Sequence, residues 1–305
     1  MFAFYWKVPE NGFEWRKASP TGEEKDWLHP RGDDGRSDGA PEYRTYAPLE
    51  NSALFKTFAD IKQTREGILA FATQYGALGL PLRADVPSMQ AEAMEIWVHE
   101  ILIMQHAIQL WEALKKKNVT FISRFIQWSE DPATKRQTAA YAGPMLGVVG
   151  ISETSLSIPP EIRSLFVPGD VIYPGWFALH TLINDCLMVH EGSLRLLWQQ
   201  ERGKLIRTLQ IVPRSLIAAI WIQFAKAVEG GRDHQQCEEC KKWFEISGNR
   251  RGDAHFCSDP CRFRAYRMRQ KEARRLHATG VPPKDIAKQV GSDTRTVKGW
   301  IAKGK

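Results

Sequence analysis

The pattern of hydrophobic and polar positions predicts helices over much of the chain before residue 231. Apolar residues recur every three or four positions, and suitable end residues are present: Gly76 can end one helix, and Ser88 can cap the next. Helices are predicted over 51–76, 88–117, 119–129 and 174–190.

Alternating patterns predict strands in between. Apolar and polar residues alternate on both sides of the turn Glu201-Arg202-Gly203, which predicts a β-hairpin over 194–211. Residues 145–152 form a further short candidate strand. Residues 1–50 are predicted to be an irregular N-terminal segment, with a strand over Phe2–Trp6 and an exposed loop from Ser19 to Pro41.

A strongly apolar segment ends this part of the chain. Pro213 can open a helix there, and Gly230-Gly231 can end it. The glycine pair is the predicted boundary after a mostly helical regulatory or effector domain, 51–231.

The distribution of charge supports this boundary. The net charge is +7, but residues 232–305 contain 18 Lys and Arg against 9 Asp and Glu, whereas residues 1–231 contain 24 against 26. All the excess positive charge therefore lies in the last quarter, which indicates a polyanion-binding tail on a near-neutral domain. No apolar run approaches membrane-spanning length and the start does not resemble a secretory signal, so we expect a cytoplasmic protein without a membrane partner.

Four of the five cysteines form two short pairs, a C-x2-C and a C-x3-C, around a 16-residue spacer. This spacing predicts one structural Zn²⁺ bound by Cys237, Cys240, Cys257 and Cys261. The alternatives are two disulfides or four unrelated thiols, and disulfides rarely persist in the cytosol. The arginines that could offset the negative charge of four thiolates are Arg250, Arg251, Arg262 and Arg264.

The residues around the cysteines predict a treble-clef-like module. Residues 243–246 and 254–256 are predicted to be the two strands of a hairpin within the spacer. Ser258 or Asp259 can cap a helix that has Pro260 in its first turn, so the second cysteine pair would flank the start of that helix.

This helix continues into a basic segment. Its narrow apolar stripe consists of Phe263, Tyr266, Ala273 and Leu276, and most of its remaining surface is cationic: Arg262, Arg264, Arg267, Arg269, Lys271, Arg274 and Arg275. A charged helix face is often only solvated, but here a single acid, Glu272, accompanies seven cations. We therefore expect these residues, with Arg250 and Arg251, to neutralise nucleic-acid phosphates.

The last segment has the spacing of a helix-turn-helix, with a plain helical hairpin as the alternative. Its inward positions are Ile286, Ala287, Val290, Val297 and Trp300 or Ile301. Gly291 suits the turn, and Ser292 or Asp293 can cap the second helix. That helix would present Thr294, Arg295 and Lys298 to the bases, while Arg267 and Arg274 on the earlier helix would contact phosphates.

The predicted fold class is mainly α with small β-hairpins (α+β). It combines a helical N-terminal domain, a treble-clef-like zinc ribbon and a C-terminal trihelical helix-turn-helix. The predicted parts are 1–50, 51–231, 232–279 and 280–305.

No catalytic constellation is evident, so we do not expect an enzyme. Two groups of polar residues at helical spacing could be imagined as metal or acid–base sites: Glu95, His99 and His106, and His180, Asp185 and His190. Neither spacing is a recognised metal pattern, which favours polar residues on the less buried side of a helix. Cys186 is predicted to be a buried packing thiol.

The segments PRSLIAAIWIQFAKAVEGG…CEECKKWF and FCSDPC, followed by an Arg-rich helix, resemble bacterial zinc-finger regulators of the CGNR/ABATE type over residues 213–275. The resemblance implies a sensory or dimerising N-terminal domain, hence a small-molecule effector and a homodimer, and a DNA-binding zinc ribbon. This chain differs in having Arg262-Phe263-Arg264 after Cys261, not Gly-Asn-Arg, and in its appended helix-turn-helix.

The sequence thus predicts a cytoplasmic, bacterial-type transcriptional regulator that binds double-stranded DNA in a sequence-specific way. The alternative is an RNA-binding, mobile-element or defence-associated protein that uses the same basic tail. An enzyme tethered to nucleic acid is a third class.

Overall fold

The computed structural model describes ten ranges of the chain, and all structural statements below concern them: 4–18, 25–32, 42–79, 92–130, 137–144, 151–155, 165–190, 193–201, 204–246 and 254–302. The chain forms two compact units, residues 1–231 and 232–305. The division falls directly after Gly230-Gly231. It is a mixed α/β structure in which helices are combined with small antiparallel sheets.

The N-terminal strands belong to unit 1 and contribute to its core. They are β1 (Trp6–Pro9), β2 (Phe13–Ala18), β3 (Lys25–Pro30), β4 (Tyr43–Tyr46) and β5 (Glu92–Ala93). Strand β1 pairs with β4, and β3 lies between β2 and β5. Val8, Phe13 and Leu28 are almost fully buried in the main core. The prediction of an irregular segment over 1–50 was wrong, and β3 lies inside the predicted loop Ser19–Pro41. Strand β3 pairs with its neighbour β2, whereas the pairs of β1 with β4 and of β3 with β5 join segments more distant in sequence.

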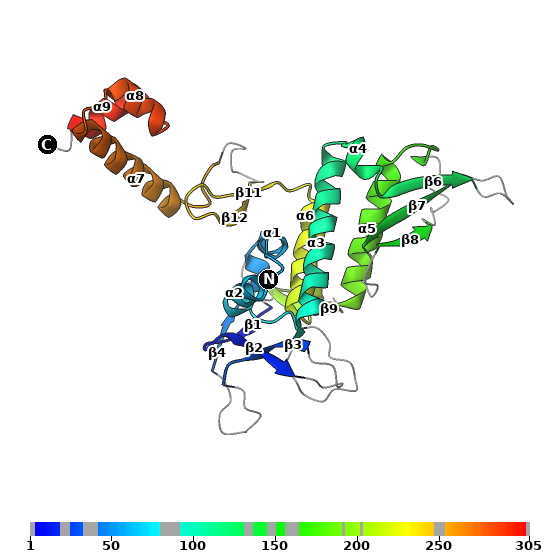
Figure 1. The fold of residues 1–305 in the computed structure, drawn as a ribbon. Coiled ribbons are helices and arrows are strands. Elements are labelled where there is room, and N and C mark those ends of the chain that lie inside the picture. The colour runs from blue at the N-terminus through cyan, green and yellow to red at the C-terminus, as the bar shows by residue number, and fades with distance from the viewer. Residues whose placement is uncertain are drawn as a thin grey trace. The chain divides into compact units, whose positions relative to one another are not determined.

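Helices form the centre of unit 1. The 3-10 turn η1 (Pro48–Glu50) precedes α1 (Leu54–Ala59), α2 (Arg65–Tyr75), α3 (Met94–Lys115), α4 (Val119–Ile122), α5 (Ile172–Val189) and α6 (Leu216–Glu229). Figure 1 shows α3, α5 and α6 side by side. Aromatic rings join these helices: Trp111 of α3 packs edge-on against Phe224 of α6, with ring centroids 5.6 Å apart.

Several helix boundaries differ from the predicted ones. The helix expected over 51–76 is two helices, because the Thr64 side chain caps a new start by accepting a hydrogen bond from Gly67 N. Helix α3 begins at Met94, and Ser88 lies outside the described residues. Helix α6 begins after Ser215, whose hydroxyl accepts from Ala218 N at 3.1 Å, rather than at Pro213.

The remaining strands of unit 1 form two sheets. One has the order β6 (Ile126–Glu130), β7 (Gln137–Pro144), β8 (Ile151–Ser155), and the other is the hairpin of β9 (Ser193–Glu201) and β10 (Lys204–Val212). The hairpin prediction is confirmed, with Leu194 opposite Ile211. The predicted helix over 119–129 is only the turn α4, which strand β6 follows. The predicted strand over 145–152 is shifted to β8, and residues 145–150 lie outside the described part.

Unit 2 combines a two-stranded sheet with three helices. Its elements are β11 (His234–Gln236), β12 (Trp243–Glu245), α7 (Asp259–Ala278), α8 (Pro283–Gln289) and α9 (Thr294–Ala302). The last three helices share a small apolar core in which Ala273, Ile286, Ala287, Val297 and Trp300 are buried. In neither unit do the described residues include a helix long and apolar enough to cross a membrane.

Candidate metal centre and nucleic-acid interface

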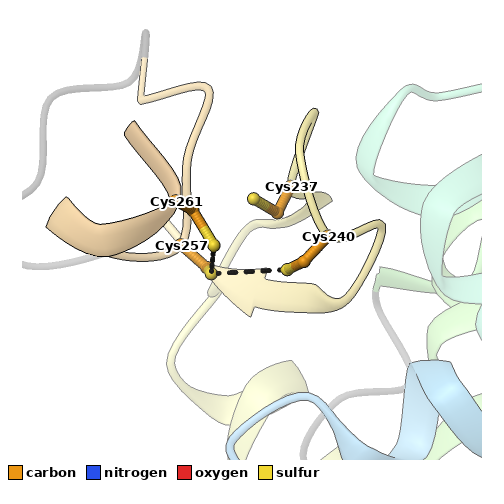
Figure 2. A group of neighbouring side chains, drawn as sticks. All are labelled: Cys237, Cys240, Cys257 and Cys261. Atoms are coloured by element: carbon orange, nitrogen blue, oxygen red, sulfur yellow. Dashed lines mark hydrogen bonds between the residues drawn. The ribbon is translucent and has the colours of Figure 1, made fainter. Parts of the chain in front are cut away.

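The four paired cysteines lie together in unit 2, with their sulfur atoms all within 4.8 Å of one another (Figure 2). Cys257 Sγ is 3.7 Å from Cys240 Sγ and 3.6 Å from Cys261 Sγ, so these sulfurs are not joined as disulfides. Four sulfurs placed 2.3 Å from a tetrahedral Zn²⁺ would be about 3.8 Å apart. The cluster therefore has the dimensions of a four-thiolate metal site.

The first pair occupies the turn between β11 and β12. Cys237 N donates to Lys242 O, and Lys241 N donates to Cys237 O, both at 2.9 Å. Lys241 has a φ of 59°, which tightens this turn. The hairpin is thus built around the first cysteine pair: β12 pairs with β11, not with the predicted return strand 254–256. That segment contacts the first cysteine turn instead: Glu238 N donates to His255 O at 3.0 Å, and His255 Nδ1 lies 2.9 Å from Glu238 Oε1.

The second pair lies at the start of α7. Ser258 is the N-cap residue and Pro260 occupies the first turn, as predicted. Cys257 precedes the helix and Cys261 lies within its first turn, where the exposed amides favour thiolates. At Cys257, burial and the neighbouring cysteine thiols act in the opposite direction and raise the thiol pKa. At Cys237, burial acts to raise the thiol pKa, but hydrogen bonds from the Cys240, Cys257 and Glu239 amides outweigh it and lower the pKa to about 6.

Not every predicted counter-charge is available to the cluster. Arg262 pairs with Asp259 at 3.1 Å, and Arg264 with Glu239 at 3.8 Å. The latter pair links α7 to the first cysteine turn. Arg250 and Arg251 lie outside the described residues.

The predicted phosphate contacts of α7 separate into different roles. Arg274 Nε donates to the carbonyl of Trp300 at 3.0 Å, so this side chain makes a structural contact with α9. Arg275 forms two bonds with Glu272, and Arg269 is only half-exposed. Within the described ranges, Arg267 and Lys271 are exposed and form no ion pair, which leaves them available to a polyanion.

The segment after α7 forms a tight turn between two short helices. Gly291 has a φ of 62°, and Ser292 N donates to Ala287 O at 3.0 Å. Asp293 caps α9 by accepting from Thr296 N and Thr296 Oγ1 at 2.8 and 2.7 Å, and these bonds lower its pKa. Thr294 is half-buried at the start of α9, and the Arg295 and Lys298 side chains are exposed.

Trp300 joins α9 to α7. Its indole Nε1 donates to Tyr266 Oη at 2.8 Å, and the two rings meet edge-on with centroids 5.3 Å apart. Val297 and Trp300 are buried as predicted. The predicted apolar stripe of α7 is only partly covered, since Phe263 is 54% exposed.

In unit 1, the polar groups considered from the sequence do not converge. Glu95 is exposed and His99 half-buried, whereas His106 is buried and hydrogen-bonded to Tyr141 Oη at 2.6 Å. His106 is therefore not on the less buried side of its helix. His180 is exposed and Asp185 half-buried, and in the described residues only the cysteine cluster groups three or more metal-ligand side chains.

A buried pair in unit 1 was missed from the sequence. His190 Nε2 lies 3.2 Å from Glu100 Oε2, and both side chains are enclosed. Glu100 lies in α3 and His190 directly follows α5, 90 positions later, so no local spacing indicates their contact. Cys186 is fully buried, as predicted, and burial raises the pKa of its thiol.

The buried imidazole of His106 predicts loss of stability in acid. Burial lowers its pKa from 6.5 to about 4. Below about pH 6.5 this histidine is therefore protonated in the unfolded chain but remains neutral in the folded chain. Stability should be fully present above about pH 6.5 and should fall by about 3 kcal/mol as the pH approaches 4. Denaturant unfolding of unit 1 at several pH values measures this.

The matched variants for this prediction are His106→Gln and His277→Gln. His106→Gln should reduce the loss of unfolding free energy between about pH 6.5 and 4. His277→Gln, at an exposed position of α7, should leave that loss as it is in the parent protein. If His106→Gln lost as much stability in acid as the parent protein, His106 would not be the cause of that loss.

Comparison with protein-family models, curated proteins and solved structures finds no match to this chain.

Proposed function

We propose that unit 2 is a DNA-binding module stabilised by one structural Zn²⁺, and that the chain is a transcriptional regulator with unit 1 as its regulatory part. The observation that supports this best is α7. One continuous helix carries Cys261 of the sulfur cluster at its start, exposed cations along its length and Ala273 of the bundle core near its end. The helix that the proposed metal would hold at its start is thus itself one of the three helices of the bundle.

Four cysteines and the S···S spacing fit zinc better than hard cations, which prefer oxygen ligands. The metal would fix the two chain segments that carry the cysteine pairs, and would contribute no open coordination position for chemistry. The role of the site is then structural.

In the proposed binding mode, α9 contributes the base contacts. Asp293 caps its N-terminus, and Arg295 and Lys298 are exposed on its outer side. Arginine can pair bidentately with guanine in the major groove, and such a contact contributes about 1–3 kcal/mol of discrimination. The short helix α8 and the turn at Gly291 hold α9 in place.

The test is selection of bound sequences from random duplex DNA, in parallel with random RNA, followed by binding isotherms on the selected site. Arg295→Ala should reduce discrimination at one base position by about 1–3 kcal/mol. Lys288→Ala, at an exposed position of α8, should change the affinity for every sequence by the same factor. Preferential enrichment of RNA, or unchanged discrimination in Arg295→Ala, would contradict the proposal.

A further inference from the structure

Two groups of exposed cations in unit 2, one on α9 and one on α7, lie on helix sides that point away from the bundle core. On α9, Arg295 and Lys298 each precede a buried core residue by two positions, namely Val297 and Trp300. Two positions along an α-helix correspond to a rotation of about 200°. Because Val297 and Trp300 point into the bundle core, Arg295 and Lys298 point away from it.

The same relation holds on α7. Lys271 precedes the fully buried Ala273 by two positions, and Arg267 is one turn before Lys271 on the same side. Arg267 and Lys271 therefore point away from the core. We call the surface formed by Arg267, Lys271 and the neighbouring exposed residues Arg264 and Phe263 the α7 outer face. Helices α7 and α9 pack against a common core, so their outer sides diverge.

This divergence limits what a single duplex can touch. Packed helices are about 8–10 Å apart axis to axis, and each is about 10–12 Å wide with side chains, so the two outer faces are separated by roughly 20 Å of protein. A straight duplex seated on α9 faces Arg295 and Lys298 and has the bundle between it and Lys271. The cations of the α7 outer face then remain without phosphate partners from that duplex.

We propose that the α7 outer face binds a second segment of duplex DNA, so that one chain holds two segments at once. The inference rests on the proposed DNA binding by α9. The charge is complementary to phosphate: Arg267 and Lys271 are exposed on this face and have no ion pair in the described part of the chain. Contacts to phosphates carry no sequence information, so a helix face that contacts only the DNA backbone would bind any sequence.

Functionally, such a unit would bridge a specific site, held by α9, to any nearby DNA, held by α7. The second contact would be strongly weakened by salt, with a slope of about −0.9 per neutralised phosphate. Once the first segment is bound, neighbouring DNA on the same molecule is present at high effective concentration, so a weak second contact suffices.

The experiment is a stoichiometric titration of the full-length protein with a short duplex of about 16 base pairs, one and a half helical turns, followed by sedimentation at low salt. The expected result is two duplexes per chain. This ratio also separates bridging from dimerisation, because a dimer with one site per chain still binds one duplex per chain.

Two matched charge reversals locate the sites. Arg267→Glu with Lys271→Glu should reduce the ratio to one and leave sequence discrimination intact. Arg295→Glu with Lys298→Glu should also reduce it to one, and the remaining binding should no longer depend on sequence. All four side chains are exposed, so circular dichroism and metal content should match the parent protein.

The outcomes distinguish the inference from the proposed function. A ratio of one in the parent protein, or an undiminished ratio in the Arg267 and Lys271 variant, overturns the second site while DNA binding stands. Absence of any duplex binding by the parent protein overturns the proposed function itself.

Discussion

Replacing Cys240 by serine is expected to remove the bound metal and unfold residues 232–261, while α8 and α9 remain folded. The apolar cluster around the sulfur atoms is very small: of its non-cysteine members, only Phe244 is buried, with Ala254 and Phe256 partly buried. Such a cluster cannot offset the entropy of ordering the segment. Structural zinc sites contribute about 10–16 kcal/mol in zinc-finger peptides, so we expect the metal to supply most of the stability.

Elemental analysis and hydrogen exchange measure the two parts of this expectation. The parent protein should hold one Zn²⁺ per chain, and Cys240→Ser should hold none and lose amide protection in β11, β12 and the first turns of α7. The matched control is Cys186→Ala, which removes the remaining cysteine, buried in unit 1. It should retain full zinc content. Full occupancy in Cys240→Ser would exclude the four-cysteine site.

Replacing Trp300 by alanine is expected to unfold the bundle of α7, α8 and α9 without affecting unit 1. Trp300 is 4% exposed in a core of only six buried side chains. Loss of a buried tryptophan typically costs about 3–5 kcal/mol, which is comparable to the whole stability that so small a core supplies. Amide protection in α8 and α9 should disappear, and the proposed sequence-specific DNA binding should be lost with it.

The control for this variant is Tyr266→Phe. It removes only the hydrogen bond that Tyr266 Oη accepts from the Trp300 indole and keeps the edge-on ring contact. We expect a loss of about 1 kcal/mol and a bundle that remains folded. If Trp300→Ala left the protection of α8 and α9 unchanged, the bundle core would have to be held by other contacts.

The candidate site was more predictable than the rest of the chain because its signals are local. The two cysteine pairs each have short spacing, so their clustering follows once the spacer folds back. The N-cap at Ser258, the turn at Gly291 and the cap at Asp293 depend on residues within one helical turn. The burial of Ile286, Ala287 and Val297 follows from helical periodicity.

Contacts between distant segments could not be predicted from local sequence signals. Residues 254–256 are as suitable for a strand as His234–Gln236, yet β12 pairs with the latter because Cys237 and Lys242 close the shorter turn. Arg267 and Arg274 both lie in the Arg-rich helix α7, seven positions apart, and the sequence does not separate their roles. Arg274 donates to Trp300 O because α9 packs beside it, whereas Arg267 forms no ion pair with any of the described residues.

What the sequence alone determined is therefore the helices of unit 2, the four cysteines and the excess of positive charge after residue 231. These depend on spacing, capping and composition, which one segment contains in full. The tertiary structure decided the strand pairing of the first 50 residues and the burial of His106, Glu100 and His190. It also decided that Arg274 of α7 donates to the backbone of α9. Each of these depends on which distant segments pack together, and that is set by the free energy of the whole core rather than by any one stretch of chain.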